Sequence, residues 1–235
     1  QGILPHHTKW AQFFESLRFV VIDEMHTYRG VFGSHVANVL RRLQRICRFY
    51  GARPRFVLAS ATVGNPQGLA EQLTGFKVHS IENSGAARGM QCMVLMDPSD
   101  SPAQTAIVLL KAALARQLRT IVYTQSRKMA ELISLWAQEK SGRFADRISV
   151  YRAGLLPEER RRIEADLKSG KLLAVVSTSA LELGIDIGDL DLCVLAGYPG
   201  SIMATLQRSG RVGRKGQTSA VILLAGQDAL DQYYI

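Results

Sequence analysis

The sequence predicts an α/β fold in which parallel sheets are covered by helices on both faces. Short, nearly continuous apolar runs alternate with longer segments of helical periodicity along almost the whole chain. Strands that alternate with helices in this way are typically joined as parallel β-α-β units. The chain contains no internal repeat and no low-complexity tract.

Two strands and two helices are expected in the first third of the chain. The expected elements are strands at 19–22 and 55–59 and helices at 33–50 and 66–73. The segment 82–89 is small and polar, which is typical of a linker. We therefore expect two domains, one over residues 1–85 and one over residues 86–235.

The same pattern restarts after the linker and continues to the end of the chain. Pro102 stands where the first helix of this part is expected to begin, a position that favours proline. The expected strands are 91–96, 120–123, 148–151, 172–176, 192–195 and 220–224, and the expected helices are 102–117, 128–139, 157–168 and 202–208. The second domain therefore holds enough strands for a complete sheet, whereas the first domain does not.

Composition narrows the class of protein. With 29 Lys and Arg residues against 20 Asp and Glu residues, the formal net charge is +9, which favours a polyanionic partner. No apolar run is long enough to span a membrane, so no membrane partner is expected. Three widely spaced cysteines indicate a reducing cytoplasm rather than disulfides or a zinc site. The first residues lack an initiator Met and resemble no signal peptide, so we expect a piece of a larger protein.

An acidic pair directly follows the first expected strand. Asp23 and Glu24 stand at its carboxyl end, which is where parallel sheets bind ligands. Carboxylates there could hold Mg²⁺, with Asp23 binding it through water and Glu24 orienting or deprotonating an attacking water. The alternative is an acidic cap or a solvent-exposed turn.

Three polar residues near this pair are candidates for coupling roles. Ser60 and Thr62 end the next strand, so both motifs are expected at neighbouring strand tips, where hydroxyl groups could bond the acids. His26 could connect a nucleotide site at the acidic pair to Ser60, or to Gln207 near the end of the chain. The alternatives are an ordinary turn or helix cap for Ser60 and Thr62, and a structural role for His26.

A basic segment near the end of the chain is the most specific motif. Residues 207–214 have the sequence Gln-Arg-Ser-Gly-Arg-Val-Gly-Arg. We expect Arg211 and Arg214, three residues apart, to lie on one face of a helical turn, with glycines that let other backbone approach closely. Two guanidinium groups delivered together suit the negative charge that develops when a γ-phosphate is transferred.

Two other strands of the second domain end in polar residues. Ser126 and Arg127 open a helix and suit a phosphate, although a plain serine cap with a surface arginine is an equal alternative. Thr178 could donate to a nucleic-acid phosphate, and Gly184 and Asp186 could approach the ribose and phosphates of ATP. Here the alternative is an ordinary strand-loop-helix connection.

Arginines also recur along the expected helix 33–50. Arg41, Arg45 and Arg48 form a stripe with helical spacing. We interpret this stripe first as a solvated helix face, and second as a contact to a nucleic-acid backbone.

Together these motifs resemble those of the superfamily 2 DExH-box helicases, in the family's order. The matching segments are 23–26 for motif II, 60–62 for motif III, the region of Ser126 for motif IV, 178–186 for motif V and 207–214 for motif VI. Within the superfamily, residues 180–187, 197–200 and 230–234 are similar to the RecQ-related YprA-like branch.

The resemblance implies two RecA-like parallel-sheet lobes, the first incomplete and the second complete, with ATP and Mg²⁺ in the cleft between them. It implies that Arg211 and Arg214 are arginine fingers and that Gln207 senses the γ-phosphate. It also implies that Ser126, Arg127 and Thr178 contact the backbone of the tracked strand.

The implied function is an ATP-dependent DNA helicase that moves 3′ to 5′ and takes part in DNA repair. Its implied partners are single-stranded or forked DNA, with RNA left open, and the rest of the parent helicase. The implied location is a bacterial cytoplasm, in association with the nucleoid.

The phosphate-binding loop of these enzymes is missing from the sequence. No G-x-x-x-x-G-K-[ST] motif occurs, and the only Gly-Lys pair, Gly170-Lys171, has different surroundings. Without this loop the phosphates have no backbone cradle and no neutralising lysine. We therefore expect the parent protein to hydrolyse ATP and the chain alone to be ATPase-deficient.

Two other functions fit the same motifs. One is an ATP-driven translocase or remodeller that does not separate strands. The other is a nucleic-acid-binding module that has lost its nucleotide site. A strand-displacement assay distinguishes the first from a helicase, and the sequence upstream of residue 1 in the parent protein distinguishes the second.

Overall fold

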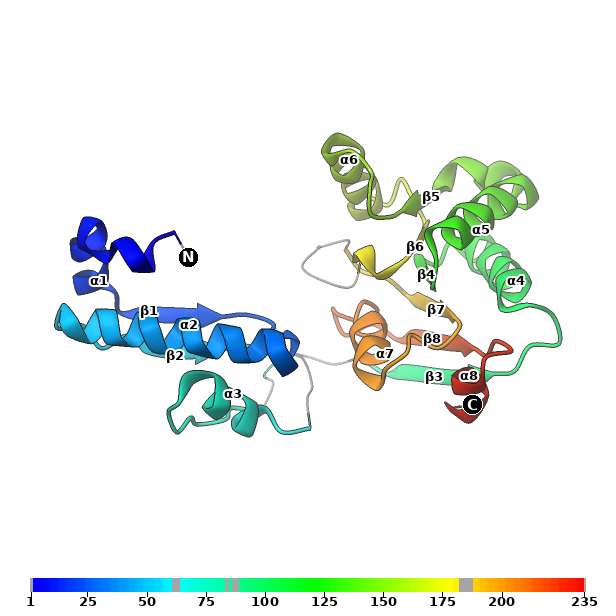
Figure 1. The fold of residues 1–235 in the computed structure, drawn as a ribbon. Helices are drawn as coiled ribbons and strands as arrows, with labels where there is room; N and C mark the ends of the chain where they lie inside the picture. Colours follow the sequence, from blue (N-terminus) through cyan, green and yellow to red (C-terminus); the bar gives the residue numbers. More distant parts are fainter. Residues whose placement is uncertain (1, 61–63, 83–84, 86–88, 182–187, 235) are drawn as a thin grey trace. The chain divides into compact units, whose positions relative to one another are not determined.

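The computed structural model describes residues 2–60, 64–82, 85, 89–181 and 188–234. The chain divides into two compact units, Gln1–Ser84 (unit 1) and Gly85–Ile235 (unit 2), each with its own sheet (Figure 1). Over the described ranges, no helix is both long enough and apolar enough to cross a membrane.

Unit 1 is built on a parallel pair of strands. β1 (Phe19–Ile22) pairs with β2 (Arg55–Leu58) in a register that sets Phe19 opposite Arg55 and Ile22 opposite Leu58. The remaining elements of the unit are the 3₁₀ helices η1 (Leu4–Trp10) and η2 (Met25–Thr27) and the α-helices α1 (Ala11–Ser16), α2 (Gly30–Phe49) and α3 (Pro66–Thr74).

The two faces of this sheet differ, because successive side chains of a strand point to opposite sides. Ile22 packs with Leu40 of α2 and Leu73 of α3 in one apolar cluster. On the other face Phe19 is 58% exposed and Val21 is 69% exposed. The helices α2 and α3 therefore cover one side of the β1–β2 sheet.

The long helix α2 packs through a single stripe. Its buried residues recur at intervals of three or four positions, which is the spacing of one helix face. They are Gly33, Ala37, Leu40, Gln44 and Cys47. The helix ends just before Gly51, whose φ of 80° is outside the helical region.

Unit 2 contains a six-stranded sheet in the order β3-β8-β7-β4-β6-β5, in which every neighbouring pair is parallel. The strands are β3 (Gln91–Met96), β4 (Thr120–Thr124), β5 (Ile148–Tyr151), β6 (Ala174–Ser177), β7 (Leu192–Ala196) and β8 (Ser219–Leu224). The helices are α4 (Pro102–Ala115), α5 (Arg127–Lys140), η3 (Gly142–Arg147), α6 (Pro157–Lys168), η4 (Ser179–Leu181), α7 (Ile202–Ser209) and α8 (Ala229–Tyr234).

Both faces of this sheet are buried along its central strands, whereas the edge strand β3 is largely exposed, with Met93 48% and Leu95 50% exposed. Along β4, Val122 belongs to one apolar cluster, with α4 and α5, and its neighbours Ile121 and Tyr123 belong to a second cluster. The second cluster includes Leu167 of α6. Alternate residues of one strand therefore pack on opposite layers, which explains why the strands of unit 2 are apolar almost throughout.

The structure confirms the predicted elements and corrects some of their ends. The strands at 19–22, 91–96 and 148–151 and the helix at 157–168 have the predicted bounds. The strand predicted at 172–176 runs from Ala174 to Ser177 instead. The helices η1, α1 and α8 were not predicted, because each is too short to show a clear helical period.

One prediction tests the core of unit 2. Leu110 of α4 is fully buried, whereas Val108 on the same helix is 64% exposed. We expect Leu110→Ala to lower the free energy of unfolding by about 2–5 kcal/mol, because it leaves a cavity. The control Val108→Ala should change it by less than about 0.5 kcal/mol. Equal effects in urea unfolding would contradict this packing.

Candidate functional site

The acidic pair occupies a sharp turn at the end of β1. Glu24 has left-handed backbone angles (φ 48°, ψ 43°), which are uncommon for a residue other than glycine. Its amide donates a hydrogen bond of 2.8 Å to Oδ1 of Asp23. The Glu24 side chain is 38% exposed. Such strain is often found at functional sites, so the turn marks this edge of the sheet as a candidate.

Backbone hydrogen bonds continue the strand pairing beyond this turn. The amide of Ala59 donates to the carbonyl of Ile22 at 2.8 Å, and the amide of Met25 donates to the carbonyl of Ala59 at 3.0 Å. Ser60 follows directly. The parallel register of β1 and β2 therefore places Ser60 next to the acidic turn.

His26 connects the two motifs. Its Nδ1 lies 3.3 Å from Oγ of Ser60 and 3.4 Å from Oε2 of Glu24. The His26 side chain is only 8% exposed, so its ring is held between these partners. Of the two partners expected for His26, Ser60 is in contact, and Gln207 belongs to unit 2.

The donor groups at this turn fit Mg²⁺ only together with a nucleotide. Mg²⁺ prefers oxygen ligands and commonly takes one or two carboxylates plus substrate phosphates and water. Asp23 and Glu24 supply such carboxylates. Among the described residues, at this turn or elsewhere, no group of three or more His, Cys, Asp or Glu side chains is placed to hold a metal ion alone.

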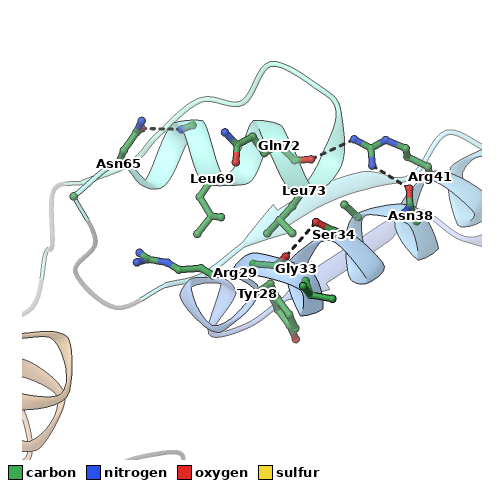
Figure 2. Close-up of a pocket in the computed structure, with 15 residues that line it drawn as sticks. Tyr28, Arg29, Gly33, Ser34, Asn38, Arg41, Asn65, Leu69, Gln72 and Leu73 are labelled. Carbon is green, nitrogen blue, oxygen red and sulfur yellow. Dashed lines mark hydrogen bonds between the residues drawn. The ribbon is translucent and has the colours of Figure 1, made fainter. Parts of the chain in front are cut away.

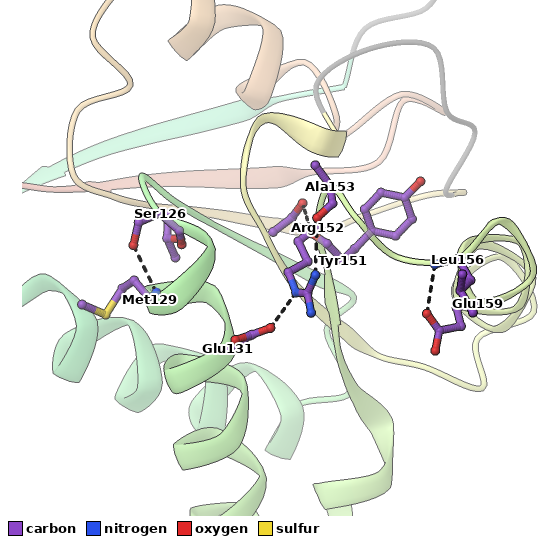
Figure 3. A network of polar contacts seen from close by, with 10 residues as sticks. Ser126, Met129, Glu131, Tyr151, Arg152, Ala153, Leu156 and Glu159 are labelled. Atoms are coloured by element: carbon purple, nitrogen blue, oxygen red, sulfur yellow. Dashed lines mark hydrogen bonds and ion pairs between the residues drawn. The ribbon is translucent and has the colours of Figure 1, made fainter.

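In unit 2, Ser126 caps helix α5 at the end of β4. Its Oγ accepts a hydrogen bond of 3.1 Å from the amide of Met129 (Figure 3). Its carbonyl accepts one of 2.9 Å from the hydroxyl of Thr124. Arg127, the first residue of the helix, is exposed. The serine cap is therefore present, and the Arg127 side chain beside it is accessible to a ligand from solvent.

Two further hydroxyl groups, those of Ser177 and Tyr151, form hydrogen bonds near Thr178, the residue expected to contact a phosphate. Thr178 is only 8% exposed, and the neighbouring Ser177 hydroxyl donates to the carbonyl of Tyr151 at 2.7 Å. The Tyr151 hydroxyl donates to Oε1 of Glu164 at 2.8 Å. Burial, and then this bond, raise the pKa of Tyr151 to about 12, so its hydroxyl remains a neutral donor near neutral pH.

The expected helical turn for Arg211 and Arg214 was wrong. Helix α7 ends at Ser209, because Val212 forms a parallel bridge to Leu190 and Gly213 takes a φ of 72°. Arg211 is 6% exposed, whereas Arg214 is exposed and its Nε donates to the carbonyl of Gly210 at 3.0 Å. The two guanidinium groups therefore do not share one helix face.

Sequence reasoning also missed Arg208. Its guanidinium lies 5.2 Å from the centre of the Tyr123 ring, and the residue is 7% exposed. A cation held over an aromatic ring in this way fixes the end of α7 on β4. Arg208 is part of the basic motif in the sequence, but its contact with Tyr123 arises only because the fold packs α7 against β4.

The segment after the linker also contacts both ends of the loop between α7 and β8 (residues 210–218). This loop carries Arg211 and Arg214 and is here called the arginine-bearing loop. The Gln91 side chain donates to the carbonyl of Ser209 at 3.1 Å, and the amide of Ser219 donates to the carbonyl of Met90 at 2.9 Å. A Cβ at Gly89 would collide with the backbone carbonyl of Gln217, so this approach needs glycine. The start of β3 therefore supports the arginine-bearing loop.

Three of the expected site residues lie outside the described part of the chain. They are Thr62, Gly184 and Asp186. Gln207, on α7, is half-buried.

Two family models match the chain. The helicase conserved C-terminal domain matches residues 90–216, and the DEAD/DEAH box helicase domain matches residues 1–69. The first match alone covers more than half of the chain.

Individual relatives agree with these matches. The ATP-dependent helicase YprA of Bacillus subtilis is 49% identical over 245 residues, which cover 100% of this chain and 33% of that protein. The ATP-dependent helicase hrq1 of Schizosaccharomyces pombe is 37% identical, over 100% of this chain and 24% of that protein. The chain thus spans a third or less of the length of these relatives.

A crystal structure of the DUF1998 helicase MrfA bound to DNA and AMPPNP superposes with a TM-score of 0.93 at 48% identity. The match covers 99% of this chain and 34% of that one. The parallel sheets described above thus match RecA-like helicase cores. The chain belongs to the helicases that carry the DEAD/DEAH box and the conserved helicase C-terminal domain.

Proposed function

We propose that this chain is part of an ATP-dependent DNA helicase that uses ATP hydrolysis to move along single-stranded DNA. The observation that carries the proposal is the acidic turn at Asp23 and Glu24, in contact with Ser60 through His26. YprA, 49% identical, is named an ATP-dependent helicase, and the MrfA structure is described as bound to DNA and AMPPNP.

We assign the chemistry of unit 1 to its acidic turn. Asp23 would hold Mg²⁺, with Glu24 beside it, and Mg²⁺ supplies neutralisation of phosphate charge when bound. Glu24 orients or deprotonates the attacking water. His26 and Ser60, together with Thr62, would couple this turn to the state of the nucleotide.

In unit 2 we propose that Arg211 and Arg214 stabilise the charge of the transferred γ-phosphate, and that Gln207 senses it. Arg214 is already exposed, whereas Arg211 must leave its buried position to reach a ligand. Gly184 and Asp186 would contact the ribose and phosphates of ATP.

The DNA contacts belong, in this proposal, to Ser126, Arg127 and Thr178. Contacts to phosphate rather than to bases allow movement along any sequence. The exposure of Arg127 supports its role, whereas the burial of Thr178 requires a local rearrangement before its hydroxyl can donate to DNA. We further propose 3′-to-5′ movement and a role in DNA repair, by analogy with the family.

We assign residues 1–85 to a first RecA-like lobe that lacks its phosphate-binding loop, and residues 86–235 to a second lobe. The sequence contains no G-x-x-x-x-G-K-[ST] motif, so no lysine of this type can neutralise the nucleotide phosphates. The chain alone should therefore be ATPase-deficient. ATP turnover is accordingly to be measured on the full-length protein.

Glu24→Gln should abolish ATP hydrolysis while ATP binding stays nearly unchanged, because the amide keeps the size of the side chain but cannot accept a proton. The measurement is DNA-stimulated ATP turnover, with nucleotide binding measured in parallel. Glu15→Gln, an exposed acid on α1, serves as the matched control. Full turnover by the Glu24 variant would refute the role of this carboxylate.

Arg214→Ala should lower the rate of ATP turnover by about 10³- to 10⁵-fold, which is the usual contribution of an arginine finger. Because Arg214 is exposed, the variant should unfold at the same urea concentration as the parent. Arg116→Ala, at the exposed end of α4, is the control. If both variants hydrolyse ATP equally fast, Arg214 does not act on the nucleotide.

A further inference from the structure

Unit 1 contains a cavity of about 1020 Å³ between helices α2 and α3, here called the α2–α3 pocket. One wall is formed by residues of the segment from Tyr28 to Arg41, and the other by residues of the segment from Gly64 to Leu73. Figure 2 shows Leu69 and Leu73 pointing from α3 toward α2. The acidic turn at Asp23 and Glu24 does not line this pocket.

The pocket is positively charged. Among the described residues that line it, two are arginines and none is an acid. The lining also carries three side-chain amides that can donate hydrogen bonds to an anion, those of Asn38, Asn65 and Gln72, whereas the Ser34 hydroxyl donates to the carbonyl of Gly30. A concave surface with charge of one sign concentrates ligands of the opposite sign.

The two arginines occupy opposite ends of the pocket. Arg41 lies with its guanidinium nitrogens 3.5 Å from Oδ1 of Asn38 and 3.5 Å from the carbonyl of Gln72, which keeps it along the wall (Figure 2). Arg29 stands at the start of α2, at the other end. Both residues are exposed, so both can meet a ligand without unfolding the unit.

The distance between these arginines selects the ligand. Twelve residues along a helix separate the two Cα atoms by about 18 Å. Because the contacts with Asn38 and Gln72 hold the Arg41 guanidinium at its own end, one phosphate group does not contact both arginines in this arrangement. A nucleic-acid strand carries a phosphate at every step of roughly 3.4 Å or more and can contact both.

We propose that the α2–α3 pocket binds the phosphate backbone of a single strand of nucleic acid through Arg29 and Arg41. The proposal rests on the proposed function in that it requires a nucleic-acid substrate. It adds a binding site in unit 1, separate from the contacts assigned to Ser126, Arg127 and Thr178 in unit 2. It also gives the arginine stripe of α2 a role at one of its positions.

The test is the affinity of the full-length protein for a fluorescein-labelled oligo(dT) strand, measured by anisotropy over a range of salt concentrations. Arg29→Ala and Arg41→Ala should each weaken binding roughly three- to tenfold. Each should also reduce the slope of log affinity against log salt by about 0.7, the value for one lost contact to a single strand. The matched controls are Arg42→Ala on the same helix and Arg53→Ala after it, both exposed and outside the pocket.

Three results would overturn the proposal. If the pocket variants bind like the controls while the unaltered protein binds the strand, this site is refuted and the proposed function stands. If the unaltered protein binds no strand at all, both fail. If inorganic phosphate at constant ionic strength binds the unaltered protein more tightly than the Arg29 and Arg41 variants, while the strand binds all three proteins equally, the pocket takes isolated anions instead.

Discussion

The parallel pairing of β1 with β2 is the constraint on which the candidate site of unit 1 depends. Because the register sets Ile22 opposite Leu58, the residues that follow each strand leave the sheet at the same edge. The hydrogen bond from the amide of Met25 to the carbonyl of Ala59 extends this alignment past the strand ends. A shift of one residue would turn Ser60 away from the acidic turn.

The corresponding constraint in unit 2 is the loop that follows α7. The helix cannot continue through Gly213, whose backbone is left-handed, and the bridge from Val212 to Leu190 fixes the loop to the segment just before β7. Arg208, held over Tyr123, fixes the other end of the segment. Arg214 is thereby presented to solvent while Arg211 stays buried, so the two arginines start from different environments.

Most of the fold could be predicted from the sequence because its signals are local. Apolar runs such as 91–96 and 148–151 define strands without knowledge of their neighbours. The N-cap at Ser126 also depends on residues within one turn. The helices η1, α1 and α8 are too short for periodicity to reveal them.

The candidate site was predictable to a lesser degree, because its geometry depends on distant contacts. That His26 contacts Ser60 follows from the strand register, and this was one of two partners considered. The end of α7 depends on Leu190, and the support of its last turn depends on Gln91, which is more than 100 residues away. No local pattern in residues 207–214 encodes either contact.

A double-mutant cycle between His26 and Ser60 tests the central claim most directly. The free energy of unfolding in urea is measured for the unaltered chain, His26→Ala, Ser60→Ala and the double variant. Side chains in contact should give a coupling energy of at least about 0.5 kcal/mol. A coupling within about 0.3 kcal/mol of zero would show that the two side chains do not interact, and would contradict the strand register on which the site depends.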